Sequence, residues 1–226
     1  MILIGQYDSP FVRRVGIALT LYDLPFEHRP WSVFGDAEKL RAINPLMRVP
    51  VLVLPDDTAL TDSHMILDYL DNLVKQPLFP SAEPARHRAL RIAALACGLA
   101  DKAVSLFYER RLHEVTSAAW EHRCRVQITA VLGLLEAERP VRPWWFGDEI
   151  GHADIALACA LRFQHDPSYA GDNAAFANLV CLAVSLLRNR GIGAGPQGEI
   201  PEELFEALGL SREKAEDAVS KVLSAE

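Results

Sequence analysis

The chain has 226 residues and a formal net charge of −7, and half of its residues are hydrophobic. This composition excludes a disordered chain, and the acidic balance argues against a nucleic-acid surface, which needs clustered Lys and Arg. No segment approaches the ~20 uninterrupted apolar residues of a transmembrane helix, and the short apolar run at residues 1–5 lacks the basic flank of a signal peptide. We therefore expect a soluble, cytoplasmic protein with no nucleic-acid or membrane partner.

The four cysteines are widely spaced and form neither a CxxC pair nor a metal-ligand pattern. Each lies in an apolar stretch with helical spacing, where a free cysteine behaves as a small core residue. We expect reduced, buried thiols and no metal site. The four are Cys97, Cys124, Cys159 and Cys181.

The first 75 residues alternate short apolar runs with helical patterns. Ser9-Pro10 is typical of a helix start, since Ser is a good N-cap and Pro suits the first helical position. Asp62-Ser63 begins a later helix whose expected buried face is Ile66, Leu67, Leu70 and Leu73. The pattern predicts strands at 2–4, 25–31, 50–54 and 59–61, and helices from 10 to before 25, at 36–43 and from 63. This βαβαββα order is that of a thioredoxin-like α/β domain.

A Pro-rich stretch at 76–84 is the best domain boundary, and almost everything beyond it has helical spacing. We expect a thioredoxin-like domain at 1–76, a linker at 77–85 and an all-α helical bundle at 86–226. The predicted helices span 85–113, 117–138, 152–164, 173–189, 201–208 and 211–223, with an aromatic loop at 140–146 and a Gly-rich break at 191–198. The second of these helices should bury a stripe of Trp120, Cys124, Ile128, Val131 and Leu135.

Four short motifs carry chemistry or capping signals, and each also has a plain structural interpretation. In the segment 7–15, the Ser9 hydroxyl lies at a helix N-terminus, which favours an anion but equally fits a simple cap. In 44–52, a Pro opens an apolar strand after Arg48, which is either a ligand contact or a surface charge. In 61–70, Asp62 and Ser63 offer a carboxylate and a hydroxyl beside free helix-end N–H groups, or again only a cap. In 147–156, Gly151 precedes Asp154 at the third helical position, which leaves half a capping box.

These four motifs, in this order, resemble the glutathione S-transferase family, and the match covers about residues 1–163. The segment 7–15 is similar to that of serine-type bacterial members. The family usually has Glu-Ser where this chain has Asp62-Ser63, and Ser or Thr where it has Gly151. The resemblance implies that Ser9 stabilises the glutathione thiolate as the catalytic hydroxyl, with Tyr7 as the rival hydroxyl. It also implies a glutathione site formed by Phe11, Arg48, Val49, Pro50, Asp62 and Ser63.

Within that site the resemblance assigns separate contacts. A cis Val49–Pro50 bond turns the Val49 backbone toward the cysteinyl unit, and Arg48 reaches the glycine carboxylate. Asp62 and Ser63 hold the γ-glutamyl head. Hydrophobic substrates are expected near Phe11, Val12, Leu106, Phe107 and Tyr108, although core packing is the simpler explanation of each.

The leading function is conjugation of glutathione to small hydrophobic electrophiles, a detoxification chemistry. The alternatives are a glutathione-dependent isomerase, peroxidase or lyase, and a non-catalytic transferase-like binding protein. We expect a homodimer in which Asp101 of one subunit reaches the γ-glutamyl ammonium bound to the other. Its motivation is a row of small residues on the first long helix of the second half, Ala89, Ala93, Ala96 and Ala100.

Overall fold

The computed structural model describes residues 1–141, 144–161, 211–213 and 216. The chain divides into two compact units, Met1–Ala160 and Leu161–Glu226, and nearly all of the described residues belong to the first. The helices expected at 173–189 and 201–208, the break at 191–198, Cys181 and most of the helix expected at 211–223 lie outside the described residues.

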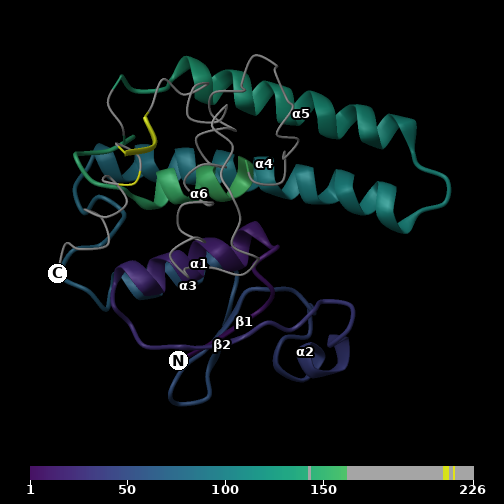
Figure 1. Ribbon diagram of the computed structural model, residues 1–226, viewed down its shortest axis with the longest axis horizontal. Coiled ribbons are helices and arrows are strands. Elements are labelled where there is room, and N and C mark those ends of the chain that lie inside the picture. Colours follow the sequence, from purple (N-terminus) through teal and green to yellow (C-terminus); the bar gives the residue numbers. More distant parts are fainter. Residues whose placement is uncertain (142–143, 162–210, 214–215, 217–226) are drawn as a thin grey trace. The chain divides into compact units, whose positions relative to one another are not determined.

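A four-stranded mixed sheet forms the centre of the N-terminal half, with strand order β2-β1-β3-β4 (Figure 1). β1 pairs parallel with β2, whereas β1 and β3, and β3 and β4, are antiparallel. A parallel pair needs a crossover, and α1 provides it. The bounds are β1 Ile2–Ile4, α1 Pro10–Leu21, β2 Glu27–Arg29, α2 Ala37–Ile43, β3 Val51–Val53, β4 Ala59–Thr61 and α3 Ser63–Asp71. The predicted βαβαββα order is confirmed.

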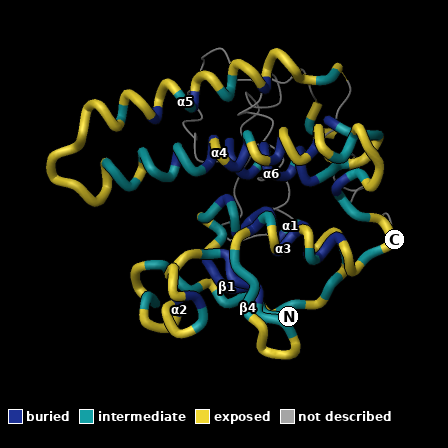
Figure 2. Tube along the Cα trace, turned by 180° about the vertical axis from the view of Figure 1, so that it is seen from behind, coloured by how far each residue is buried: buried dark blue, intermediate teal, exposed yellow. Residues whose placement is uncertain are grey.

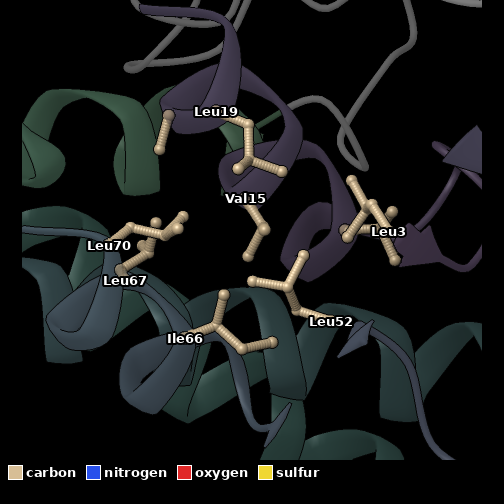
Figure 3. Close-up of a cluster of buried hydrophobic side chains, with 9 residues drawn as sticks. Leu3, Val15, Leu19, Leu52, Ile66, Leu67 and Leu70 are labelled. Carbon is tan, nitrogen blue, oxygen red and sulfur yellow. The ribbon is translucent and has the colours of Figure 1, made fainter. Parts of the chain in front are cut away.

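Successive side chains of a strand point to opposite faces of the sheet, so the two faces pack into two separate cores. Leu3 and Leu52 are register partners, and both belong to the core that α1 and α3 complete. Their neighbours Ile4 and Val51 point to the other face, where they pack with Leu40 of α2. Figure 3 shows the first core, with Val15 and Leu19 of α1 facing Ile66, Leu67 and Leu70 of α3.

Leu73 was predicted to continue the buried face of α3, and that prediction is wrong. The helix ends at Asp71, and Leu73 is 48% exposed. The backbone N–H of Asn72 bonds to three carbonyls of the last turn, so the chain leaves the helix before Leu73 can join its face.

Beyond residue 84 the described chain is helical, with α4 at Ala85–Leu112, α5 at Ala118–Ala137 and α6 at His152–Leu161. α4 and α5 lie side by side, as both views show (Figures 1 and 2). In α5 the predicted stripe holds at Cys124, Ile128 and Leu135, which are buried, while Trp120 at 37% exposure does not belong to it. Ser117 caps α5 by accepting from the Trp120 N–H at 3.3 Å.

The four alanines of α4 are buried within the chain itself, at 0–2% exposure. The argument that they form a free surface for a second subunit is therefore wrong, because small residues here let neighbouring elements of the same chain approach. The homodimer stays a prediction without that support. None of the helices in the described residues is long and apolar enough to cross a membrane.

A buried polar network joins α1, α3, the segment after α3, and α6. Asp71 accepts from the Tyr22 hydroxyl through Oδ1 and from the Phe79 N–H through Oδ2 at 3.2 Å. The Nε2 atom of His152 lies 2.8 Å from Asp71 Oδ1. The Tyr22 hydroxyl in turn accepts from the Leu78 N–H at 2.7 Å. Every described group of this network except His152 Nδ1 has a partner, so the network stabilises the fold at this junction.

α6 begins beside that network and shows the predicted half of a capping box. The Gly151 N–H donates to Asp154 Oδ2 at 2.9 Å, and the Trp145 N–H donates to Asp154 Oδ1 at 3.0 Å. Burial nevertheless raises the pKa of the Asp154 carboxyl, against the lowering effect of these two hydrogen bonds.

Candidate functional site

Ser9 is the N-cap of α1, in extended conformation, with Pro10 in the first helical turn. Its Oγ accepts from the Val12 N–H at 3.4 Å. A hydroxyl that accepts through a lone pair keeps its own hydrogen for a further partner. Ser9 therefore has a proton to donate at the positive end of a helix dipole, which suits an anion.

The rival hydroxyl, Tyr7, faces a different part of α1. A Cβ added at Gly16 would lie 2.7 Å from the Tyr7 hydroxyl oxygen, and the Tyr7 ring stacks on His28 at 4.1 Å between centroids. Gly16 is seven residues beyond Ser9, about 10 Å along a helix axis. The Tyr7 hydroxyl thus lies along the flank of α1 rather than at its N-terminus, and burial raises its pKa.

The Val49–Pro50 peptide bond is cis, as predicted. Pro50 is buried and Val49 half-buried, whereas Arg48 is exposed. The Asn44 side chain holds the preceding loop by donating to the Arg48 carbonyl at 2.9 Å and accepting from the Leu46 N–H at 3.1 Å. In the described part of the chain, no hydrogen bond or ion pair involves the Arg48 guanidinium, which leaves it available to an acid.

Asp62 and Ser63 stand at the start of α3 but differ in role. Asp62 is the N-cap and accepts from the His64 N–H at 2.8 Å through Oδ1. This bond is the plain capping function that the sequence also allowed. Ser63 is 3% exposed, and its Oγ accepts from Arg14 at 3.4 Å. The predicted pair is therefore one exposed carboxylate and one buried hydroxyl.

Arg14 lies beneath Ser63, 1% exposed. Its Nη1 donates to Ser63 Oγ and, at 2.7 Å, to Cys97 Sγ of α4. Its Nε and Nη2 have no hydrogen-bond partner among the described residues, and none of the described carboxylates lies within ion-pair distance. A buried cation in such surroundings gives the start of α3 a positive field. Burial raises the pKa of the Cys97 thiol, and Arg14 opposes that rise.

Arg13, next to it, fixes the loop that leads to Ser9. Its guanidinium donates to the Tyr7 carbonyl at 2.7 Å and to the Asp8 carbonyl at 3.1 Å. A third bond, 2.8 Å long, reaches the Cys159 carbonyl in the last turn of α6, where a cation is favoured. Arg13 therefore ties the approach to Ser9 to a helix of the second half.

A cavity of about 390 Å³ is within the range of small-molecule sites, and Val49 is the one predicted glutathione contact in its lining. The loop before Ser9 contributes Asp8 to its wall, and Val49 contributes from the segment before β3. The remaining wall comes from the loop after β2 and the last turns of α4. The full lining is Gln6, Asp8, Trp31, Ser32, Val33, Phe34, Val49, Phe107, Tyr108, Arg111 and Leu112.

Two of the five residues expected near hydrophobic substrates, Phe107 and Tyr108, line this cavity. Val12 does not, because it is fully buried in the core of α1 and α3. Leu106 and Phe11 are half-buried and outside the lining.

The sequence interpretation missed the wall from the loop after β2, of which Phe34 is the clearest case. Phe34 is 61% exposed and meets Tyr108 edge to face at 5.6 Å. The available signal was the apolar character of this loop, with Trp31, Val33 and Phe34 before Gly35, since a loop normally exposes small or polar residues. It also missed Arg111, Arg14 and the Tyr22–Asp71–His152 network.

The fold and these residues define a thioredoxin-like domain joined to helices, with a hydroxyl at the N-terminus of α1 beside an aromatic cavity. Residues 3–78 match the model of the glutathione S-transferase N-terminal domain, and residues 118–178 match that of the C-terminal domain. The chain belongs to the glutathione S-transferase family.

Relatives of known sequence agree with this assignment. The uncharacterized GST-like protein YibF of Escherichia coli K12 is 32% identical over 72% of this chain and 81% of its own. Glutathione S-transferase U4 of Arabidopsis thaliana is 39% identical over 71% and 70%. The maleylacetoacetate isomerase of Pseudomonas aeruginosa is 30% identical over 70% and 78%.

Among solved structures, a glutathione S-transferase from Methylobacillus flagellatus crystallised with glutathione bound is similar to this chain. It superposes with a TM-score of 0.68 at 28% identity, and the match covers 72% of this chain and 81% of that one. Sequence and structure comparisons therefore lead to one family.

Proposed function

We propose that this protein is a serine-type glutathione transferase that conjugates the glutathione thiolate to small hydrophobic electrophiles. Ser9 is the catalytic residue, and glutathione lies along Phe11, Arg48, Val49, Pro50, Asp62 and Ser63. The observation that carries the proposal is the place of the Ser9 hydroxyl, which caps α1 directly after the cavity residue Asp8, while the Tyr7 hydroxyl packs beside Gly16.

Charge complementarity supports the arrangement of glutathione along this surface. The γ-glutamyl carboxylate suits the start of α3, where the buried Arg14 supplies a positive field and Ser63 a hydroxyl. The glycine carboxylate suits the exposed Arg48. The γ-glutamyl ammonium pairs with Asp62, whose second oxygen is not used by the cap bond to His64.

Ser9 acts on the sulfur of bound glutathione. A free thiol has a pKa of about 8.5, so only a few per cent is thiolate at neutral pH. One charge-assisted hydrogen bond from Ser9, with the helix N-terminus behind it, lowers that value by about 1–2 units, or roughly 1.4–2.7 kcal/mol. The thiolate then attacks the electrophilic carbon, a C–S bond forms, and the leaving group departs with its electron pair.

A second candidate is a glutathione-dependent isomerase, favoured by the similarity to the maleylacetoacetate isomerase. The same Ser9-stabilised thiolate adds to a double bond and is released after rotation. The two reactions differ in stoichiometry, because conjugation consumes glutathione and isomerisation returns it. A comparison of the total free thiol before turnover with that after turnover therefore distinguishes the two reactions. A peroxidase or lyase would use the same thiolate, whereas a non-catalytic binding protein would show no turnover at all.

We also propose a cytoplasmic, detoxifying homodimer. Each subunit has a thioredoxin-like domain at 1–76, a linker at 77–85 and a helical domain at 86–226. Asp101 is the candidate acid for the partner's γ-glutamyl ammonium; in the single chain its carboxylate lies 3.0 Å from Lys102 and is half exposed. Sedimentation at micromolar concentration tests the dimer, since a 25.0 kDa species would contradict it. Asp101→Asn should weaken glutathione binding if the assignment holds.

The decisive experiment compares Ser9→Ala with Tyr7→Phe in pH–rate profiles with glutathione and an aryl halide. Ser9→Ala should raise the apparent pKa of the bound thiol and lower turnover near neutral pH about 10- to 100-fold, with recovery at high pH. Glutathione affinity should change little. Tyr7→Phe should leave the profile in place, and a profile that moves with Tyr7→Phe instead would overturn the assignment of Ser9.

A further inference from the structure

The cavity lined by Asp8 and the last turns of α4 has one basic side chain in its wall, Arg111, and one acid, Asp8. Their neighbours are mostly apolar or aromatic, with Gln6 and Ser32 as the uncharged polar residues. In the described part of the chain, Arg111 has no hydrogen bond or ion pair. The basic residue before it is different, since Arg110 forms a two-pronged pair with Glu121 at 3.0 and 3.2 Å. Both stand in the last turn of α4, where the helix dipole favours a cation. The dipole explains why basic residues stand in the last turn of α4. It does not explain why Arg111, which has no ion pair in the described part of the chain, lines the cavity.

The rest of that wall suits a flat, unsaturated group. Phe34 meets Tyr108 edge to face, with their ring centroids 5.6 Å apart, and Phe107 lies 5.6 Å from the same Tyr108 ring. Phe34 and Phe107 are both more than half exposed, so their ring faces are open to a ligand. Aromatic pairs of this geometry are favourable beyond the area that they bury.

Asp8 fixes the direction in which a charged ligand lies. It lines the cavity and directly precedes Ser9 in the sequence. Its charge contributes, after burial, to the raised pKa of the Tyr108 hydroxyl. No ion pair joins Asp8 to Arg111 among the described residues, so neither charge cancels the other. An anionic substituent on a ligand ring is therefore disfavoured beside Asp8 and favoured beside Arg111.

We propose that the preferred electrophile is an aromatic acid whose carboxylate pairs with Arg111, whose ring lies against Phe34, Phe107 and Tyr108, and whose reactive carbon faces Ser9. The inference rests on the proposed conjugation and adds the class of substrate. A substrate of this kind carries its acid para to the reactive carbon, as in 4-chloro-3-nitrobenzoate. The thiolate attacks the carbon that bears chlorine, the C–S bond forms, and chloride leaves with the electron pair.

The test uses two glutathione conjugates that have the same shape and differ by one charge. S-(4-carboxy-2-nitrophenyl)glutathione carries the acid, and S-(4-carbamoyl-2-nitrophenyl)glutathione carries the neutral amide. Binding of each, and of glutathione alone, is measured by calorimetry on the full chain, so that the different reactivities of the two aryl chlorides do not enter. The acid conjugate should bind about 5- to 20-fold more tightly than the amide, and the advantage should shrink as salt is added.

Arg111→Gln should abolish that preference by weakening the acid conjugate alone. Arg110→Gln is the matched control, because this neighbouring arginine stands in the same last turn of α4 but is held by Glu121 instead. In turnover, Arg111→Gln should raise KM for 4-chloro-3-nitrobenzoate with kcat nearly unchanged, which is the signature of lost ground-state binding.

Equal affinity for the two conjugates, or a preference that survives Arg111→Gln, would overturn the inference, while binding of glutathione itself would leave the proposed function standing. Failure of glutathione itself to bind would overturn the proposed function, and the inference with it. The arm with glutathione alone therefore keeps the two failures apart.

Discussion

Arg14 and Asp71 are buried charged side chains that both contact elements of the second half, yet their surroundings are opposite. Asp71 meets three donors, from Tyr22, Phe79 and His152. Arg14 donates through one nitrogen only, to Ser63 and Cys97, and its Nε and Nη2 find no partner within the described chain. The fold supplies hydrogen-bond partners to both oxygens of Asp71 but to only one nitrogen of the Arg14 guanidinium.

The difference separates a structural charge from a functional one. Burial raises the pKa of Asp71, but its hydrogen bonds to His152, Tyr22 and Phe79 outweigh that effect and hold the pKa below its usual value. The fold itself therefore stabilises that charge. A buried guanidinium with free donors costs free energy in the protein alone, and its neighbour Ser63 belongs to the proposed glutathione site. We therefore expect a ligand carboxylate at the start of α3 to supply a partner for Arg14.

Asp71→Ala should be the most destabilising of the changes considered. It leaves the Tyr22 hydroxyl, the Phe79 N–H and His152 without their acceptor, and unsatisfied buried groups of this kind cost about 3–4 kcal/mol together. Chemical denaturation of the variant measures the loss. Asp68→Ala is the control on the same helix, since Asp68 is exposed and makes only a 3.4 Å pair with Arg86; its unfolding curve should hardly move.

Glutathione affinity of folded Asp71→Ala should equal that of the parent, because Asp71 lies outside the proposed site. A weakened affinity together with unchanged stability would reverse the roles given to the two charges.

Arg14→Met should do the opposite, with glutathione affinity falling about 10- to 100-fold and stability constant or higher. The affinity estimate is that of a hydrogen bond to a charged group, about 1.5–3 kcal/mol. Stability should hold because a well-packed apolar side chain often replaces a buried charge without loss. Calorimetry with glutathione and a denaturant series on the same preparation give both numbers.

A large loss of stability in Arg14→Met with full glutathione affinity would show that Arg14 is structural like Asp71. The two variants should thus have separate effects. Asp71→Ala lowers stability and leaves glutathione affinity unchanged, whereas Arg14→Met lowers glutathione affinity without loss of stability.

Titration of His152 should have a smaller effect on stability, one that depends on pH. Burial lowers its pKa and outweighs the opposing effect of Asp71, and Arg14 lowers it further. A lowered pKa means that the unfolded chain binds more protons below pH about 6.5, so the contribution is complete above that pH and is lost as the pH falls. Between pH 7.5 and 5.5 the loss of stability is at most about 1.4 kcal/mol, the limit for one imidazole that stays neutral in the folded chain.

The pH dependence of unfolding should flatten in this window in His152→Asn. His64 also has a pKa lowered by burial and by Arg14, so His64→Asn is measured beside it to separate the two. An unchanged slope in His152→Asn would show that the buried ring does not titrate there.

Much of the N-terminal half could be predicted from sequence because its signals are local. Ser9-Pro10 and Asp62-Ser63 each mark a helix start within two residues, and β-branched residues mark β3. The order of these elements then limits the fold to few arrangements. The candidate residues Ser9, Val49 and Ser63 follow from the same local motifs.

The cavity wall and the buried charges could not be predicted in the same way, because they depend on contacts between distant segments. Phe34 meets Tyr108 and Arg14 meets Cys97 across more than 70 residues. The alanines of α4 were placed on the wrong side for the same reason, since spacing alone does not say which neighbour covers a helix face. Gly151 is a case where a local rule and a distant contact give opposite predictions.

Gly151→Ser tests that conflict and has the smallest expected effect. Local capping rules predict a gain of a few tenths of a kcal/mol, because Ser is a better N-cap than Gly and would complete the box with Asp154. However, a Cβ at residue 151 would lie 2.9 Å from the Leu78 carbonyl oxygen, which accepts from the His152 N–H at 3.2 Å. Crowding of that kind costs about 1 kcal/mol, so Gly151→Ser should lower the free energy of unfolding slightly. Gly151→Ala adds the same Cβ without a hydroxyl and should lose somewhat more. A Ser variant more stable than the parent would mean that Leu78 moves aside easily and that the saturated network around Asp71 tolerates the shift.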